Sequence, residues 1–132
     1  MATFYDIDRA NARLAELIPL LEGLRDDRTT VAHLQADLLR RRRSNGDEEH
    51  AREAADQEDE VLRVVRRMEQ AVAQIDGWSI TLRDIGSGLV DFPALVSGRQ
   101  VWLCWRLGEP AIEWWHEVSA GFDSRRPLIE LA

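Results

Sequence analysis

Histidine, cysteine and carboxylate side chains gather in the last third of the chain, and these residue types bind metal ions or transfer protons. His116 and Glu117 are adjacent, Cys104 is the only cysteine, and Asp91 and Asp123 lie on either side of them. Histidine is the commonest metal ligand in proteins, and its possible companions here are Asp91, Cys104, Glu113, Glu117 and Asp123. A shared site requires these side chains to lie on one face of a common structural element.

Two predicted β-hairpins position these side chains. A glycine-containing turn at residues 97–98 sets Asp91 opposite Cys104 on neighbouring strands. A second turn, at residues 108–109, separates two segments that each alternate between apolar and other residues, the pattern of half-buried strands. The region therefore predicts a small antiparallel sheet with two unlike faces.

With a loop of two or four residues at the second turn, one face of this sheet is apolar and the other is mixed. The apolar face is expected to meet the helices, and it carries Val90, Phe92, Val101, Leu103, Trp105, Ile112, Trp114 and His116. The mixed face is the candidate ligand site, and its candidate binding residues are Asp91, Trp102, Cys104, Arg106, Glu113 and Trp115. Asp91 and Arg106 are expected to form an ion pair on this face or to share a ligand there.

This register places His116 on the face opposite Asp91 and Cys104. A set of ligands divided by a sheet cannot hold a metal unless a β-bulge turns one residue over. No metal is therefore expected, and His116, Glu117 and Asp123 are retained as the candidate metal ligands. No catalytic or nucleotide-binding motif occurs, so the catalytic residues and any cofactor are left unassigned.

Two long helices are predicted before the sheet. Apolar residues recur at heptad spacing in both, which is typical of coiled coils, and they become sparser toward the connection between the helices. Pro19 predicts a kink or a restart of the first helix. A run of four arginines followed by Asn45-Gly46 predicts where that helix ends, and His33 and His50 fall on segments expected to be solvated.

The helices have more apolar surface than a single hairpin and a short sheet can cover, which predicts a homodimer with helix packing contributed by both chains. The net charge is −7 and the chain has no lysine, so it is a poor candidate for binding nucleic acid. A single cysteine excludes an internal disulfide and fits a reducing compartment. No signal segment or bilayer-length apolar run is present, so no membrane association is expected and the predicted location is cytoplasmic.

Several longer motifs resemble a known family. They are the run Gly-Leu-Val-Asp-Phe-Pro-Ala-Leu at residues 88–95, the run Val-Trp-Leu-Cys-Trp-Arg-Leu-Gly-Glu at 101–109, Trp-His-Glu at 115–117 and Ala-Gly-Phe at 120–122. Together with Ala10-Asn11 near the start, they are similar to the bacterial "domain of unknown function 2203" family. The resemblance spans nearly the whole chain and implies no activity.

The predicted fold class is α+β, with a long antiparallel two-helix hairpin followed by a three- to four-stranded antiparallel β-meander, in which residues 78–82 form the additional strand. One domain is expected over residues 1–132: hairpin about 6–76, meander about 78–118 and tail 119–132. The first functional hypothesis is a non-enzymatic interaction or assembly module that dimerises through its helices. The alternative is a small metal- or ligand-binding enzyme that uses Asp91, Trp102, Cys104 and Arg106 together with the His116-Glu117 segment and binds a small molecule.

Overall fold

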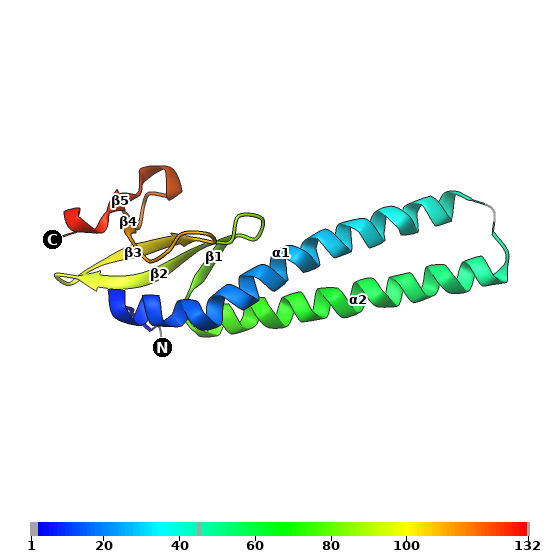
Figure 1. The fold of residues 1–132 in the computed structure, drawn as a ribbon, viewed down its shortest axis with the longest axis horizontal. Helices are drawn as coiled ribbons and strands as arrows, with labels where there is room; N and C mark the ends of the chain where they lie inside the picture. The colour runs from blue at the N-terminus through cyan, green and yellow to red at the C-terminus, as the bar shows by residue number, and fades with distance from the viewer. Residues whose placement is uncertain (1–2, 45, 132) are drawn as a thin grey trace.

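The computed structural model describes residues 3–44 and 46–131. Within them, a helical hairpin of α1 (Ile7–Arg43) and α2 (Glu48–Gly77) precedes an antiparallel sheet whose strands follow chain order. The five strands of the described region are β1 (Thr81–Asp84), β2 (Leu89–Val96), β3 (Arg99–Arg106), β4 (Trp114–Glu117) and β5 (Arg126–Pro127). Two 3-10 helices, η1 (Phe122–Ser124) and η2 (Leu128–Glu130), flank β5. The predicted α+β class is confirmed, and Figure 1 shows the hairpin extending far beyond the sheet.

Asp6 caps the first helix, which continues through its proline. The side chain of Asp6 accepts a hydrogen bond from the Arg9 amide at 2.7 Å, which satisfies one free donor of the first turn. The helix is uninterrupted to Arg43, so the alternative of a restart near Pro19 is wrong. Leu17 and Leu21, on either side of the proline, are fully buried, and their packing offsets the lost backbone hydrogen bond.

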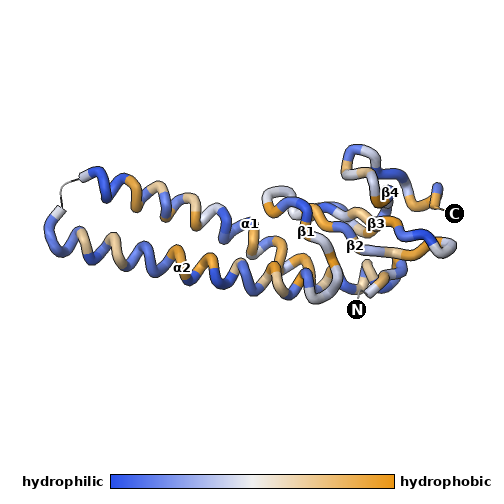
Figure 2. Tube along the Cα trace, turned by 180° about the vertical axis from the view of Figure 1, so that it is seen from behind, coloured by the Kyte–Doolittle hydropathy of each residue, from blue (hydrophilic) through white to orange (hydrophobic). Residues whose placement is uncertain are grey.

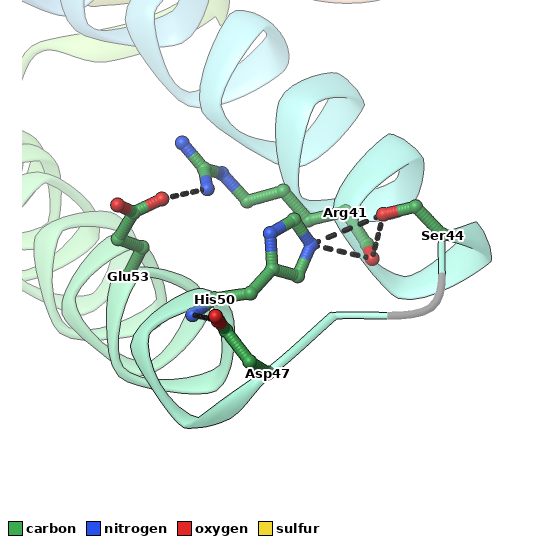
Figure 3. A network of polar contacts seen from close by, with 5 residues as sticks. All are labelled: Arg41, Ser44, Asp47, His50 and Glu53. Carbon is green, nitrogen blue, oxygen red and sulfur yellow. Dashed lines mark hydrogen bonds and ion pairs between the residues drawn. The ribbon is translucent and has the colours of Figure 1, made fainter.

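Polar contacts join the two helices at the tip of the hairpin (Figure 3). Asp47 caps α2 by accepting from the His50 amide at 3.0 Å. The His50 ring nitrogen Nε2 lies 3.1 Å from both the Ser44 hydroxyl and the Arg41 carbonyl, and the Arg41 guanidinium pairs with Glu53. His50 therefore links α1 to α2 although the residues around it are exposed, as expected for a solvated segment. Neither of the described helices combines the length and apolarity needed to cross a membrane.

The hydrophobic core lies between the base of the hairpin and one face of the sheet. The N-terminal segment joins it, because the Tyr5 amide donates to the Pro93 carbonyl at 2.7 Å and the Tyr5 ring packs edge-on against Phe92. The buried residues of this core include Leu14, Leu17, Leu21 and Leu24 from α1, Ile75 from α2, and Val90, Phe92, Val101, Leu103 and Trp105 from the sheet. The predicted apolar face of β2 and β3 is confirmed.

The β2–β3 hairpin has the predicted register, with Asp91 paired to Cys104 across the two strands. Ser97 and Gly98 both have positive φ angles, of 53° and 78°, as the two central residues of a tight hairpin turn require. The additional strand was expected at residues 78–82, and it forms instead at Thr81–Asp84 with an irregularity between Leu82 and Asp84.

The β3–β4 register differs by one residue from the prediction, and this shift turns over every side chain of β4. Trp102 pairs with His116 and Cys104 pairs with Trp114, because the loop over residues 107–113 has an odd length where an even one was expected. The amide of Ile112 donates to the Asn11 side chain of α1 at 2.8 Å. Contact with the helix therefore holds the end of this loop, and the local turn does not set the register.

Candidate metal centre

Asp91, Cys104 and His116 meet on the face of the sheet that points away from the hairpin. They stand on three adjacent strands, β2, β3 and β4, and one ligand atom from each lies within 4.8 Å of the others. Only 1–2% of the surface of each residue is exposed. The predicted placement of His116 on the apolar face is wrong, and the one-residue shift of β4 is the physical reason that the three side chains converge.

The contacts of His116 orient one ring nitrogen toward the cluster. Nδ1 lies 2.8 Å from the carbonyl oxygen of Glu117, which can only accept, so this nitrogen carries a proton. Nε2 lies 3.0 Å from Oδ2 of Asp91. Ligating histidines commonly donate one N–H to a backbone carbonyl and use the other nitrogen for the metal. The ring of His116 has this orientation.

The Asp91 carboxylate is buried with one oxygen in use and one without a partner. Oδ2 accepts from Nε of Arg83 at 2.9 Å and faces His116, whereas Oδ1 makes no hydrogen bond within the described residues. A buried acceptor left unsatisfied costs about 1–3 kcal/mol. Such an oxygen is available to a cation that enters the cluster.

Cys104 is protonated in the absence of a metal. Burial, and after it the neighbouring Asp91 charge, raises the pKa of its thiol to about 12, although Arg125 acts to lower it. Nη1 of Arg125 lies 4.0 Å from the sulfur. A thiol of this kind is a poor nucleophile at neutral pH, whereas a transition metal deprotonates a coordinating thiol on binding.

A cluster of these donors fits a zinc-class ion. Nitrogen, oxygen and sulfur ligands about 2.0–2.3 Å from a tetrahedral zinc lie roughly 3.3–3.8 Å from one another. In the structure, Nε2 of His116 and Oδ2 of Asp91 are 3.0 Å apart, and the ligand atoms of the three residues all lie within 4.8 Å of one another. These distances bracket the range expected around zinc. One thiolate and one carboxylate also balance the 2+ charge, which lowers the cost of burying the ion.

Arg125 and Glu109 form a partly buried ion pair beside the cluster. The guanidinium donates two hydrogen bonds to the carboxylate, at 2.9 and 2.8 Å, and it lies over the rings of Trp114 and Phe122 at 4.8 and 4.2 Å. Burial alone raises the pKa of Glu109, but its hydrogen bonds, chiefly from Arg125, lower it below its ordinary value overall. The pair fixes the segment that follows β4 against the sheet.

A cavity of about 270 Å³ opens above the three ligands. Residues 118–121, which follow β4, and Phe122 of η1 line this cavity. Arg83 of β1 and Leu89 of β2 line it as well. Asp91, Cys104 and His116 all line this cavity. A metal bound to three protein ligands would therefore face a space large enough for a water or a small molecule.

The other predicted ligand-binding residues are distributed differently. Trp102 shares the face of the cluster and lies under the Arg83 guanidinium at 5.1 Å, while Arg106 is exposed and lies over Phe122. The expected Asp91–Arg106 ion pair is wrong, since Arg83 is the arginine bound to Asp91. Glu113 is exposed and precedes β4.

The neighbouring tryptophans of β4 exchange their predicted places. Trp115 pairs with Leu103 and is buried in the core, and its Nε1 donates to the Pro127 carbonyl at 3.2 Å. Trp114 lies on the face of the cluster beneath Arg125. The placement of Trp115 on the mixed face and of Trp114 on the apolar face is therefore wrong, for the same reason of register.

Two candidate metal ligands lie outside the cluster of the described residues. Glu117 forms an ion pair with Arg99 at 2.6 Å, and Asp123 is exposed in η1. Sequence reasoning missed Arg83, Glu109 and Arg125. The alternation of strand residues could have indicated Arg83 once β1 was paired with β2, but no local pattern identifies the other two, because they meet only when the tail folds back.

Comparison with curated proteins and with solved structures finds no significant match. A family model described as "Uncharacterized conserved protein (DUF2203)" matches residues 3–128, nearly the whole chain. That match confirms the resemblance carried by the sheet motifs, among them the strands that supply Asp91, Cys104 and His116. The chain belongs to the DUF2203 family of uncharacterised conserved proteins.

Proposed function

We propose that this protein binds one divalent transition-metal ion of the zinc class through Asp91, Cys104 and His116, and that this ion is its functional centre. The observation that carries the proposal is the convergence of three buried donors from three strands, with Oδ1 of Asp91 lacking a partner in the described region. Structural zinc sites have four protein ligands, whereas catalytic sites have three and leave a position for water. The three-ligand set and the adjoining cavity match the second arrangement.

Contacts from residues next to the metal-binding side chains support the same proposal. Arg83 holds the Asp91 carboxylate and the Glu117 carbonyl holds the His116 ring, so two of the three ligands are oriented before the ion arrives. A zinc ion in such a site lowers the pKa of a bound water to about 7 and supplies hydroxide at neutral pH. This chemistry is that of a small metal-dependent enzyme.

Calorimetric titration of metal-free protein with Zn²⁺ tests the proposal, with matched variants. One ion per chain is expected, and Asp91→Asn and His116→Asn should weaken binding by at least about 100-fold, as expected for the loss of a direct metal ligand. Asp123→Asn and His33→Asn are the controls, because both residues are exposed and outside the cluster. Circular dichroism establishes that each variant is folded.

Cobalt substitution adds a measurement that does not depend on variants. A thiolate bound to Co²⁺ produces an intense near-ultraviolet charge-transfer absorption, so its appearance on adding Co²⁺ would identify Cys104 as a ligand. Failure to bind either metal, or equal affinity of the cluster variants and the controls, would contradict the proposal. In that case the Asp91–His116 contact is a structural ion pair of the sheet.

A second candidate function is assembly through the hairpin, favoured by an apolar groove between its helices. Two hollows of about 710 and 500 Å³ meet at Gln35, and Figure 2 shows apolar and hydrophilic residues alternating along both helices. Leu39 and Leu62 are about half exposed beside the groove, and Val72 is 39% exposed. Apolar strips of this kind are covered in helical bundles.

The charges at the two ends of this groove favour a second copy of the chain as the occupant. Arg28 of α1 and Asp76 of α2 line one end, and Arg42 of α1 and Glu58 of α2 line the other, where they also pair with each other within the chain. A twofold axis along the hairpin places α1 of one copy over α2 of its partner, so that arginine meets acid at both ends. Sedimentation equilibrium at micromolar concentration tests this, and a mass near the 15.1 kDa of one chain would contradict it.

A further inference from the structure

Arg83 lines the metal-site cavity and pairs with the Asp91 carboxylate through only one of its three guanidinium nitrogens. Arg125 is fully paired with Glu109, but Arg83 uses only Nε, which donates to Asp91 at 2.9 Å. Within residues 3–44 and 46–131, the terminal nitrogens of Arg83 donate no hydrogen bond, and its side chain is 43% exposed. Arg106 adds a second guanidinium beside Phe122. The terminal nitrogens of Arg83 are therefore available to an anion that enters the cavity.

Three larger apolar side chains are among the residues that line the same cavity. Leu89 lies on the sheet side, and Val118 and Phe122 belong to the segment that covers the ligands. The volume of about 270 Å³ equals roughly nine water molecules at the 30 Å³ each occupies in the liquid. The space therefore suits a small molecule with one anionic end and a short apolar part.

From this arrangement we infer that the metal centre binds a small carboxylate whose short apolar chain lies in the cavity. One carboxylate oxygen occupies the position that the three protein ligands leave open on the metal, and the other accepts from the terminal nitrogens of Arg83. Guanidinium groups recognise two-oxygen anions in this way, and their planar donors fit carboxylates well. The inference rests on the proposed function, since it names the class of ligand for that ion.

The contacts of Arg83 explain why this residue is the one positioned for recognition. Its Nε holds Asp91, and its guanidinium lies over Trp102 at 5.1 Å, so the side chain is oriented from two directions. Arg106 lacks a comparable hydrogen bond to a metal ligand in the described region. A neutral metal site beside a fixed guanidinium leaves one positive charge for the incoming anion.

Titration of the Co²⁺-loaded protein with isobutyrate and with phosphate tests the inference, followed by visible absorption. Isobutyrate should change the cobalt spectrum and bind at least about tenfold more tightly than phosphate, because the cavity wall contacts its apolar chain. Arg83→Gln should weaken isobutyrate by at least about tenfold, the effect of losing a charge-assisted hydrogen bond, and Arg83→Lys should restore part of the affinity. Arg99→Gln is the control, because Arg99 pairs with Glu117 outside the cavity.

The same spectra distinguish a failure of the proposed metal site from a failure of the proposed carboxylate binding. Protein without thiolate–cobalt absorption refutes the metal site and this inference with it. Protein that binds Co²⁺ but shows no response to isobutyrate refutes only the inference, as does equal isobutyrate affinity of the native protein and Arg83→Gln. Phosphate binding as tightly as isobutyrate would also overturn it, since the apolar wall would then have no role.

Discussion

Truncation of the two adjacent tryptophans of β4 tests the register that creates the candidate site. In the structure Trp115 is 2% exposed and belongs to the core, whereas Trp114 is partly buried on the opposite face. The side chains are chemically identical and neighbours in sequence. A difference in stability between Trp115→Ala and Trp114→Ala therefore reports which face each one occupies.

The expected magnitudes follow from burial and contacts. A buried tryptophan removes roughly 150–250 Å² from water, which at about 25 cal/mol per Å² is about 4–6 kcal/mol before the part retained by alanine is subtracted. Trp115→Ala should therefore lower the free energy of unfolding by about 3–5 kcal/mol, the usual range for such truncations. Trp114→Ala loses partial burial and its contact with Arg125 at 4.8 Å, about 1–2 kcal/mol.

Equilibrium unfolding in urea, followed by circular dichroism of the helices, measures both variants on the same signal. With a slope of about 1–3 kcal/mol per molar urea, a difference of about 2 kcal/mol separates the midpoints by roughly 1 M. Equal midpoints, or a larger loss for Trp114→Ala, would refute the register. His116 would then lie on the other face, away from Asp91 and Cys104.

Three further predictions concern the same sheet. Trp105→Ala should destabilise the protein by about 3–5 kcal/mol, and Trp102→Ala should destabilise it clearly less. The reason is that Trp105 is 1% exposed in the core, whereas Trp102 lies partly exposed under an arginine. The midpoints of urea unfolding of the two variants test this prediction. Burial raises the pKa of the Cys104 thiol to about 12. The free energy of unfolding of metal-free protein should therefore be constant below the unfolded pKa of about 8.5 and should fall above it, by at most about 1.4 kcal/mol per pH unit. Cys104→Ala should lack this alkaline decrease, and identical pH profiles would contradict the prediction. Although burial alone raises the pKa of Glu109, Arg125 lowers it overall, so the contribution of Glu109 to stability is present above the unfolded pKa of about 4.3 and is lost as the pH falls. Glu109→Gln should therefore lose less stability than the native protein below that pH. Unfolding curves with the same acid dependence for both proteins would count against this prediction.

The sequence alone determined those features that depend on residues close together along the chain. Heptad spacing predicts both helices, and the capping position of Asp6 and the turn at 97–98 depend on local backbone geometry. The register of β2 on β3 follows from that turn, so the turn residues themselves predict the pairing of Asp91 with Cys104. The family resemblance likewise rests on contiguous motifs, and the family match confirms it.

Only the tertiary structure decided that these two residues meet His116. The turn signal at residues 108–109 does not specify the odd length of the loop before β4, and Ile112 near the end of that loop bonds to Asn11 of α1, about one hundred positions earlier in the chain. A one-residue change in pairing reverses every side chain of a strand, so the register of β4 on β3 determines whether the histidine faces the core or the cluster. Arg125 reaches the cluster from the folded-back tail, through a contact that no periodicity in the sequence encodes, whereas strand alternation could indicate Arg83 only once β1 is paired with β2.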